Sequence, residues 1–252
     1  MMMKILILIP ARYASTRFPG KPLATIGGKP MVVHVIEKAL QISEYSYVAT
    51  DDERIFEKVR EYGGEAVMTS ASHKSGTDRC YEAYTKVLNS IGVDFDVVVN
   101  VQGDEPFITP EQISDLADAF NNPEVQIATL AKRFEDPMAI FDPNKVKVVF
   151  GTDGRALYFS RNPIPYCRGV EESNWLSTTP YYKHIGMYAY RPQALKAITE
   201  LPQGGLERAE SLEQLRWLEN GFRIAVRETK HESIGIDTPD DLAEAERFFV
   251  AK

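Results

Sequence analysis

Three cationic side chains, Arg12, Arg17 and Lys21, lie within ten residues on one polar loop. The loop follows residues 5–9, an unbroken apolar run that predicts a strand buried on both faces of a parallel sheet. Ligands of open α/β sheets bind beyond the carboxyl ends of the strands. Arg offers forked donors to phosphate oxygens, and Lys offers a point charge. The loop is therefore a candidate polyphosphate site, although a solvated basic turn would contain the same residues.

Two other phosphate-binding loops do not fit this segment. The dinucleotide pattern needs G-x-G-x-x-G, and the P-loop needs a Ser or Thr after its Gly-Lys pair. Here the Gly-Lys pairs at residues 20–21 and 28–29 are each followed by proline, so the hydroxyl that would hold magnesium is missing. A kinase or dehydrogenase therefore has little support.

Asp104 and Asp237 each follow an apolar strand, and no helix needs either of them as a cap. Residues 95–101 predict a buried strand that delivers Gln102 and Asp104 to the same sheet edge as the basic loop. Asp104 is a natural magnesium ligand, because its carboxylate can share the cation with a phosphate, while Gln102 would contact the nucleotide. Thr238 is a good cap for the last helix, so Asp237 remains as a second metal ligand.

A second loop at residues 75–79 begins the next predicted helix. Its glycine allows a ligand to approach the backbone closely, and the first amides of a helix are donors that seek acceptors. A helix cap that uses Thr77 and Asp78 would explain the same residues. The residues alone leave both interpretations open, and the candidate ligand-binding residues of this loop are Ser75, Gly76, Thr77 and Arg79.

A third group of polar residues lies in the second half of the chain. Residues 182–190 predict a strand with His184 and Tyr188 on one face and a small residue, Gly186, between them. Residues 206–220 predict a helix that carries Glu213 and Gln214 beside apolar residues and ends at a glycine. A structural histidine and a salt-bridged surface remain open as alternatives.

The predicted elements that position these residues alternate between strand and helix up to about Gln126. From there on they are closely spaced strands. Asp51 and Asp52 follow a strand, and a helix cap explains them better than a metal site. A polar, unpatterned stretch at residues 167–180 predicts a mobile loop. The other predicted strands are residues 45–50, 65–68, 126–132, 146–150, 156–160, 223–227 and 233–236, and the other helices begin at Pro30, at Asp51 with Asp52, at Thr109 and at Pro239.

The composition narrows the class of protein. The chain has 252 residues, a net charge of −7 and 44% hydrophobic residues, enough for a sizeable core. An acidic chain without a run of positive charge is a poor candidate for binding nucleic acid. No stretch approaches the ~20 apolar residues of a membrane helix, so we expect no membrane insertion. The two cysteines suit a reducing compartment, and we expect a cytoplasmic protein.

The motifs as a set resemble one family. The opening segment I-P-A-R-x-x-S-T-R-x-x-G-K-P, with S-G-T-D-R at residues 75–79, N-V-Q-G-D-E-P at 100–106 and A-L-Y-F-S-R at 156–161, is similar to the sugar-acid cytidylyltransferases. Later matches are H-I-G at 184–186, L-E-Q-L-R at 212–216 and D-T-P at 237–239. The match is closest to the members that act on 3-deoxy-manno-octulosonate (Kdo). The motifs occur in the family's order and span nearly the whole chain.

The resemblance implies an α/β fold, a Rossmann-like, mostly parallel sheet flanked by helices, with an antiparallel extension for the acceptor and for dimer contacts. This is the nucleotide-diphospho-sugar transferase fold. It implies CTP and Kdo as substrates, CMP-Kdo for lipopolysaccharide biosynthesis as the product, Mg²⁺ as cofactor and a homodimer. Arg12, Lys21, Asp104 and Asp237 would be catalytic, with the two aspartates on the metal. Ser75, Gly76, Thr77 and Arg79 would line the pocket for the cytosine base and the nearby ribose. Arg161 would bind the Kdo carboxylate, and the hydroxyl groups of Kdo would contact His184, Tyr188, Glu213 and Gln214.

We expect a single domain with a nucleotide-binding part at about residues 1–130, an acceptor and dimer part at about 131–230, and a return to the main sheet at about 231–252. Rival assignments share this fold. They are a cytidylyltransferase for sialate or for an amino-substituted Kdo, a sugar-1-phosphate nucleotidylyltransferase, whose G-x-G-T-R loop is absent here, and a nucleotide-sensing domain without catalysis.

Overall fold

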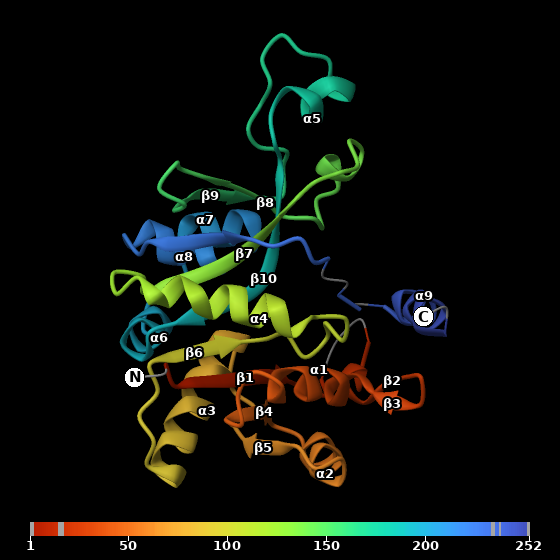
Figure 1. The fold of residues 1–252 in the computed structure, drawn as a ribbon, viewed down its shortest axis with the longest axis vertical. Helices are drawn as coiled ribbons and strands as arrows, with labels where there is room; N and C mark the ends of the chain where they lie inside the picture. Colours follow the sequence, from red (N-terminus) through yellow and green to blue (C-terminus); the bar gives the residue numbers. More distant parts are fainter. Residues whose placement is uncertain (1–2, 15–17, 233–234, 237, 251–252) are drawn as a thin grey trace. The chain divides into compact units, whose positions relative to one another are not determined.

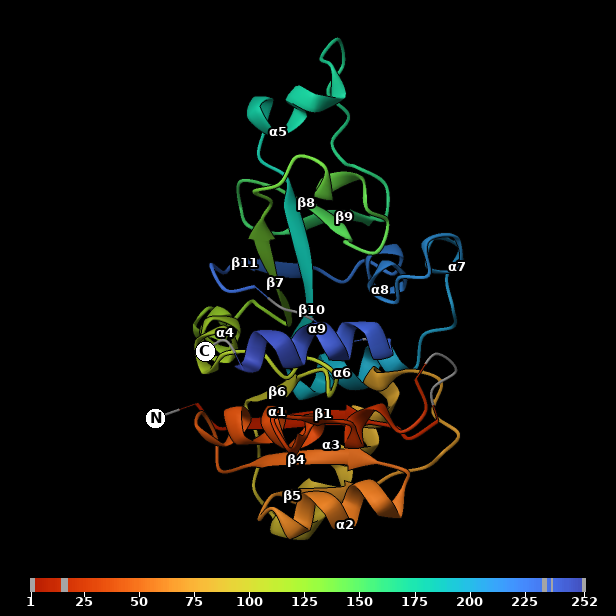
Figure 2. The same ribbon diagram turned by 90° about the vertical axis from the view of Figure 1, so that its right-hand side faces the viewer.

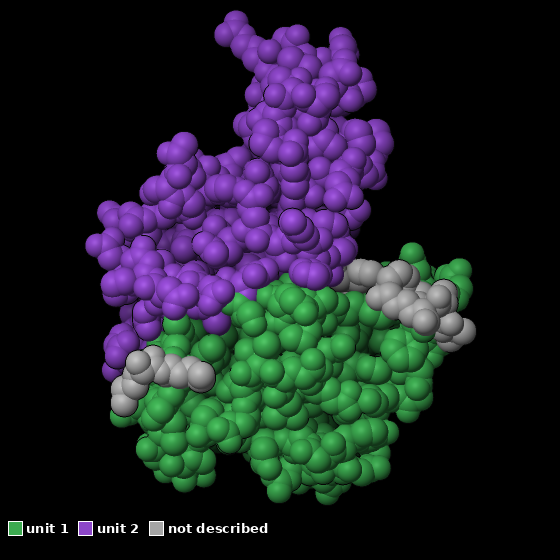
Figure 3. All heavy atoms as spheres, in the orientation of Figure 1, with its two compact units in different colours: residues 1–114, 233–252 green, residues 115–232 purple. Residues whose placement is uncertain are grey.

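The computed structural model describes residues 3–14, 18–232, 235–236 and 238–250, except for the side chains of residues 248 and 250. The chain divides into two compact units (Figure 3). Unit 1 comprises residues 1–114 and 233–252, and unit 2 comprises residues 115–232. The division falls within helix α4 (Pro110–Ala117), upstream of the change at about residue 130 that the sequence pattern predicted.

Unit 1 is built on four parallel strands (Figure 1). Their order is β6-β1-β4-β5, with β1 (Ile5–Ala11), β4 (Ser46–Thr50), β5 (Glu65–Met68) and β6 (Val97–Asn100). Strand β1 pairs with β4 on one side and β6 on the other, and residues 6–9 are fully buried. This central position explains why the first strand is apolar on both faces, as predicted.

The helices of unit 1 begin where the sequence predicted. Asp52 caps α2 (Glu53–Glu61) by accepting a hydrogen bond from the Arg54 amide, which confirms the helix-cap interpretation. Ser75, rather than Thr77, caps α3 (Gly76–Ile91) by accepting from the Asp78 amide. Helix α1 (Met31–Leu40), the helical turn η1 (Lys21–Leu23) and the short antiparallel pair β2 (Thr25–Ile26) and β3 (Lys29–Pro30) complete the first part of the unit.

The end of the chain returns to unit 1. Ile236 and, in helix α9 (Pro239–Val250), Ala245 share a small core with Ile26 and Met31. Of the predicted strand at residues 233–236, residues 235 and 236 are not in a strand, and residues 233 and 234 lie outside the described residues.

Unit 2 contains the antiparallel extension that was predicted. Strand β10 (Tyr182–Tyr190) pairs antiparallel with β7 (Ile127–Arg133) and with β8 (Lys147–Phe150), and β7 pairs parallel with β11 (Ile224–Glu228). Strands β8 and β9 (Ala156–Ser160) form the predicted hairpin, with Gly154 at φ 73° in its turn. The turn needs a left-handed residue, which glycine adopts without strain.

The predicted helix at residues 206–220 is wrong. Two shorter helices, α7 (Gly205–Glu210) and α8 (Gln214–Glu219), are separated by Ser211, which has a left-handed φ of 53°. The side chain of Arg161 binds the carbonyl oxygens of Glu210 and Ser211, so these oxygens do not need helical amide partners. Helix α6 (Pro192–Thr199) precedes this pair.

The segment at residues 167–180 is also not the unpatterned loop that its composition suggested. It forms a helical turn, η4 (Glu172–Asn174), and helix α5 (Trp175–Thr178), and Figure 2 shows it as a projection that leads into β10. Trp175 stacks on Tyr181 and packs with Phe134, Ile140 and Cys167 in a small core of its own. These aromatic residues have no regular spacing, which is why the sequence pattern missed the core.

No helix in the described part of the chain is long and apolar enough to cross a membrane.

Candidate active site

The carboxyl end of β1 is the point where three predicted segments of unit 1 meet. A Cβ atom on Gly103 would lie 3.0 Å from the carbonyl oxygen of Pro10, and a Cβ on Gly76 would lie 3.4 Å from Pro10 Cγ. Only glycine allows the loop at residues 102–104 to approach the β1 backbone this closely. The basic loop, the start of α3 and the segment that carries Asp104 therefore lie side by side.

Lys21 and Asp104, both predicted to act on the phosphates, form an ion pair with 2.5 Å between Nζ and Oδ2. The Lys21 side chain is mostly buried, and that of Asp104 is 34% exposed. Arg12 lies at the end of β1 and is exposed. Arg17 and Asp237 lie outside the described residues, but the amide of Ile236, next to Asp237 in sequence, donates to the Asp104 carbonyl at 3.0 Å.

Asp104 has the chemistry that a magnesium ion needs. Its Oδ1 atom has no hydrogen-bond partner among the described residues, while Oδ2 binds Lys21. Mg²⁺ is commonly held by one or two carboxylates together with substrate phosphates, and not by a complete protein cage. Within the described residues there is no cluster of three or more His, Cys, Asp or Glu that could hold a metal ion. The residues present fit a magnesium ion shared with phosphate oxygens.

Arg79, predicted to bind nucleotide, is buried with only 3% of its surface exposed. Its guanidinium forms an ion pair with Asp51 at 2.8 Å and donates to Thr69 Oγ1 at 2.5 Å. Asp51 follows β4 and Thr69 follows β5, so the arginine joins two strand ends to α3. This arrangement indicates that Arg79 positions the loop at residues 75–79, and its direct contact with nucleotide remains a prediction.

The loop before α3 is held by Glu82 of that helix. The Glu82 carboxylate accepts from the Ser70 amide at 3.0 Å, contacts His73 and pairs with Lys86 at 2.7 Å. Burial alone would raise the pKa of Glu82, but the hydrogen bonds from Lys86, Ser70 and His73 outweigh it and lower the pKa to about 2. Glu82 is therefore charged at neutral pH and holds residues 70–73 against α3.

Sequence reasoning missed the contact that fixes the basic loop. The guanidinium of Arg54 lies 3.4 Å from the ring centroid of Tyr13, and Asp52 holds the same guanidinium through two hydrogen bonds. The Gly20 amide donates to the Tyr13 carbonyl at 2.9 Å, which joins the two ends of the loop. Tyr13 and Arg54 are far apart in sequence and belong to no common motif, so only the fold reveals the pair.

The polar group predicted in unit 2 lies beside β10. A bulge between Ile185 and Tyr188 leaves the rings of His184 and Tyr188 5.4 Å apart. Thr129 Oγ1 lies 3.0 Å from His184 Nε2 and donates its single proton to the nearest acceptor, the Met187 carbonyl at 2.8 Å. With the Thr129 proton on the Met187 carbonyl, the His184 tautomer protonated at Nε2 satisfies this contact and leaves Nδ1 as an acceptor. Burial lowers the pKa of His184 to about 3, so its ring is neutral.

Three buried donors of unit 2 have no hydrogen-bond partner of acceptable geometry among the described residues. They are Tyr188 Oη, Gln214 Nε2 and Trp217 Nε1, and the rings of Tyr188 and Trp217 are 5.0 Å apart. An unpaired buried polar group costs about 1–3 kcal/mol. These three donors can thus form hydrogen bonds to the oxygen atoms of a ligand that is rich in hydroxyl groups. Glu213, predicted to act with them, forms a 2.7 Å ion pair with Arg216, which is buried, so the pair is not the salt-bridged surface of the alternative interpretation.

Arg161 follows β9 and is strongly attached to the protein. Its guanidinium donates to the carbonyl oxygens of Glu210 at 2.7 Å, Pro143 at 3.0 Å and Ser211 at 3.4 Å. These contacts use three of the five N–H groups of a guanidinium. The predicted grip on a carboxylate would use the remaining two, and it remains a prediction.

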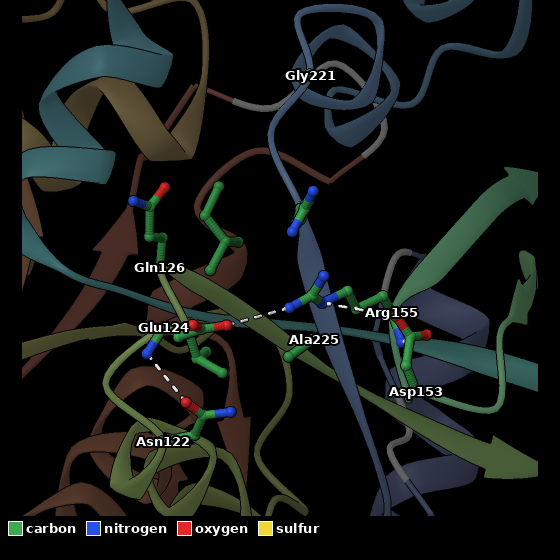
Figure 4. A pocket seen from close by; sticks show the side chains of 10 residues that line it. Asn122, Glu124, Gln126, Asp153, Arg155, Gly221 and Ala225 are labelled. Atoms are coloured by element: carbon green, nitrogen blue, oxygen red, sulfur yellow. Dashed lines mark hydrogen bonds and ion pairs between the residues drawn. The ribbon is translucent and has the colours of Figure 1, made fainter.

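Unit 2 also contains a pocket of about 690 Å³ that none of the predicted site residues described by the structure lines (Figure 4). Arg155 reaches across it between Glu124 at 3.6 Å and Asp153 at 3.7 Å. Arg223 and Ala225 line the pocket from the start of β11. Because its acidic residues neutralise Arg155, this pocket is a weaker candidate for an anionic ligand than the groups described above.

The chain is similar to known proteins. The family model described as cytidylyltransferase matches residues 6–230. A 3-deoxy-manno-octulosonate cytidylyltransferase of Phocaeicola vulgatus is 58% identical over 249 residues, which cover 98% of this chain and 97% of the relative. The chain belongs to the 3-deoxy-manno-octulosonate cytidylyltransferase family. A relative of the same name from Parabacteroides distasonis is 55% identical and is covered to 98%, as is this chain.

Solved structures agree with this family. A structure titled CMP:2-keto-3-deoxy-manno-octonic acid synthetase complexed with CTP is 42% identical, with a TM-score of 0.89, and 98% of this chain and 99% of that chain are covered. A structure named as a putative glucose-1-phosphate thymidylyltransferase, from Bacillus anthracis, is 18% identical, with a TM-score of 0.64, and 97% of this chain and 95% of that chain are covered. At this identity the likeness supports only the fold of the present chain. The predicted family and fold class are confirmed.

Proposed function

We propose that the chain transfers CMP from CTP to Kdo and releases pyrophosphate. The observation that carries the proposal is the 58% identity, over nearly the whole chain, to a relative named for this reaction. The two groups of residues described above supply what the reaction needs. Unit 1 offers cations and a carboxylate at a strand end, and unit 2 offers unpaired donors for a polyhydroxylated acceptor.

The reaction joins the anomeric hydroxyl oxygen of Kdo to the α-phosphorus of CTP and breaks the bond between that phosphorus and the oxygen that bridges to the β-phosphate. The hydroxyl proton passes to solvent, and the electron pair leaves with pyrophosphate. Such transfers depend mainly on alignment and on neutralising phosphate charge. Lys21, Arg12 and Arg17 would neutralise the triphosphate, while Gln102 and the loop Ser75, Gly76 and Thr77 would contact the nucleoside.

Asp104 and Asp237 would hold the magnesium ion, which supplies positive charge to the α-phosphate and the acceptor oxygen when bound. Asp104→Asn keeps the side-chain size but weakens the metal site. Turnover should therefore be almost abolished, while the melting temperature should stay close to that of wild type. Because the two carboxylates act as a unit, the double Asp→Asn variant should be little worse than either single variant. Wild-type activity in Asp237→Asn, or full activity in excess chelator, would contradict the hypothesis that the two aspartates share one metal site.

In unit 2, the neutral His184 would accept a sugar hydroxyl at Nδ1, and Tyr188 and Gln214 would donate to the sugar. Glu213 would accept another hydroxyl, and Arg161 would bind the carboxylate with its two remaining N–H groups. A ligand that pairs the buried donors recovers their desolvation cost, which favours a hydroxyl-rich acceptor.

The test is pyrophosphate release with each of the four nucleoside triphosphates, combined with Kdo or with N-acetylneuraminate. We expect release with CTP and Kdo alone. Backbone acceptors of the loop at residues 75–79 would pair with the cytosine amine, which uracil lacks, and an unpaired group costs about 1–3 kcal/mol, so CTP should outcompete UTP by tens-fold or more. Equal turnover with N-acetylneuraminate would support the sialate-type rival. No release with any pair would support a nucleotide-sensing domain.

We further propose a homodimer located in the cytoplasm. Large apolar side chains of unit 2 are exposed, with Met138 at 72% and Tyr166 at 74%, and a second copy of the chain could cover them. Neither Cys80 nor Cys167 forms a disulfide, which suits a reducing compartment. Light scattering should give twice the monomer mass, and a monomer at micromolar concentration would contradict the dimer.

A further inference from the structure

Lys147 of β8 is a fully buried lysine in unit 2. Its ammonium group donates to two main-chain carbonyl oxygens, that of Asp142 at 2.9 Å and that of Arg161 at 2.5 Å. Burial of a cation is costly unless strong acceptors surround it, and an apolar residue would fill the same space without that cost. The lysine therefore does more than fill the core.

Glu210 holds the same segment from the other side. Its carboxylate accepts from Ser160 Oγ at 2.7 Å and from the Arg161 amide at 3.0 Å. Ser160 lies directly opposite Lys147 in the β8–β9 pair. Lys147 and Glu210 thus bind the two main-chain groups of Arg161, the carbonyl and the amide, while Glu210 also accepts the Arg161 Nε–H through its own carbonyl oxygen.

The network connects two parts of the proposed acceptor site. Arg161 binds the carbonyl oxygens of Glu210 and Ser211, which form the break between α7 and α8, and α8 begins with Gln214. One set of hydrogen bonds therefore fixes the arginine expected to hold the acceptor carboxylate and the turn that leads to the donors expected to hold its hydroxyls. Misplacement of a binding group by 1 Å can reduce an enzyme's rate about 100-fold, so such support matters.

We propose that Lys147 and Glu210 are positioning residues for the sugar-acid acceptor and act through Arg161. The inference rests on the proposed function, because it assumes that Arg161 and Gln214 meet Kdo. The hydrogen-bond partners described above for both side chains lie within unit 2. The effect of removing either one falls on the acceptor alone.

The test compares Lys147→Met and Glu210→Gln with two control variants at exposed positions of the same unit, Lys196→Met and Glu135→Gln. For each protein, KM for Kdo, KM for CTP and kcat are measured, CTP binding is followed by calorimetry, and thermal melting reports folding. We expect KM for Kdo to rise at least tenfold in both test variants. The CTP dissociation constant should stay within twofold of wild type, and the controls should match wild type throughout.

A double variant separates positioning from a general loss of structure. If Lys147 acts through Arg161, then Lys147→Met should add less than twofold to the KM for Kdo of Arg161→Ala. A purely structural role would lower the melting temperature and leave KM for Kdo unchanged. Glu210→Gln, at a partly exposed position, and Glu210→Ala provide a graded series, with the alanine variant the more impaired.

Unchanged KM for Kdo in the folded variants would overturn the inference, and so would an equal loss of CTP affinity. If Lys147→Met does not fold, the Glu210 series decides the question by the same criteria. Failure of the proposed function is distinguishable, because wild-type protein would then not release pyrophosphate from CTP and Kdo at all.

Discussion

The buried pair of Arg79 and Asp51 offers a sharp test of how the nucleotide half of the site is held together. The sequence analysis predicted that Arg79 binds the nucleotide directly. In the structure its guanidinium forms an ion pair with Asp51 and a hydrogen bond with Thr69. Asp51→Asn removes the charge with little change in size. Arg79→Met removes the cation and keeps most of the length of the side chain.

The expected losses follow from burial. Removing one partner of a buried ion pair costs about 3–5 kcal/mol, because the other charge stays behind unpaired. The Arg79 side chain is 4% exposed and that of Asp51 is 15% exposed. Asp51→Asn leaves the more deeply buried charge, so we expect it to lose about 3 kcal/mol and Arg79→Met to lose somewhat less. The double variant should lose clearly less than the sum of the two losses.

Urea unfolding of the four proteins gives the coupling free energy, and calorimetry gives CTP affinity for those that remain folded. The exposed pair of Arg60 and Glu65 serves as control, since both side chains are about half exposed and Glu65→Gln should cost less than about 1 kcal/mol. CTP affinity should weaken in step with stability. A stable Arg79→Met protein that has lost CTP binding would refute the positioning role and make Arg79 a direct ligand.

Three further predictions use other parts of the molecule. Gly103→Ala places a Cβ 3.0 Å from the Pro10 carbonyl, so magnesium-dependent turnover should fall at least tenfold, whereas Gly205→Ala, with only ordinary contacts, should leave turnover unchanged in the same assay. The folded pKa of His184 is about 3 and its ordinary value is 6.5, so the unfolded chain binds more protons between these values and stability falls as the pH drops below 6.5. Urea unfolding at pH 7 and pH 5 should show wild type losing about 2 kcal/mol more than His184→Gln, and equal losses would contradict a neutral ring in the folded protein. Glu82→Gln should raise KM for CTP several-fold and leave KM for Kdo unchanged in steady-state assays. A rise in KM for Kdo alone would show that the Glu82 contacts do not support nucleotide binding by the loop before α3.

The sequence predicted those features of the fold that depend on local patterns. The first strand is central because residues 5–9 are apolar on both faces, and the β8–β9 hairpin follows from its glycine turn. The cap at Asp52 was also predicted, because capping depends on the residues next to the helix end. The family resemblance, carried by motifs that span the chain, was confirmed by the relatives.

What the sequence could not show depends on contacts between distant residues. The break at Ser211 interrupts an apolar pattern that continues through it, and the carbonyl oxygens there are bound by Arg161, 50 residues away. The core around Trp175 collects aromatic residues without a period. The buried charges of Lys147 and Arg79 could not be distinguished from surface charges by residue type alone.

The most direct test of the central claim is identification of the product. The wild-type chain is incubated with CTP, Kdo and Mg²⁺. The sugar nucleotide is isolated and its mass is determined by mass spectrometry, and pyrophosphate is quantified in the same sample. We predict one molecule of CMP-Kdo for each pyrophosphate released, and no conjugate when UTP replaces CTP or N-acetylneuraminate replaces Kdo. Pyrophosphate without a CMP-Kdo conjugate, or a conjugate formed equally well with N-acetylneuraminate, would contradict the account.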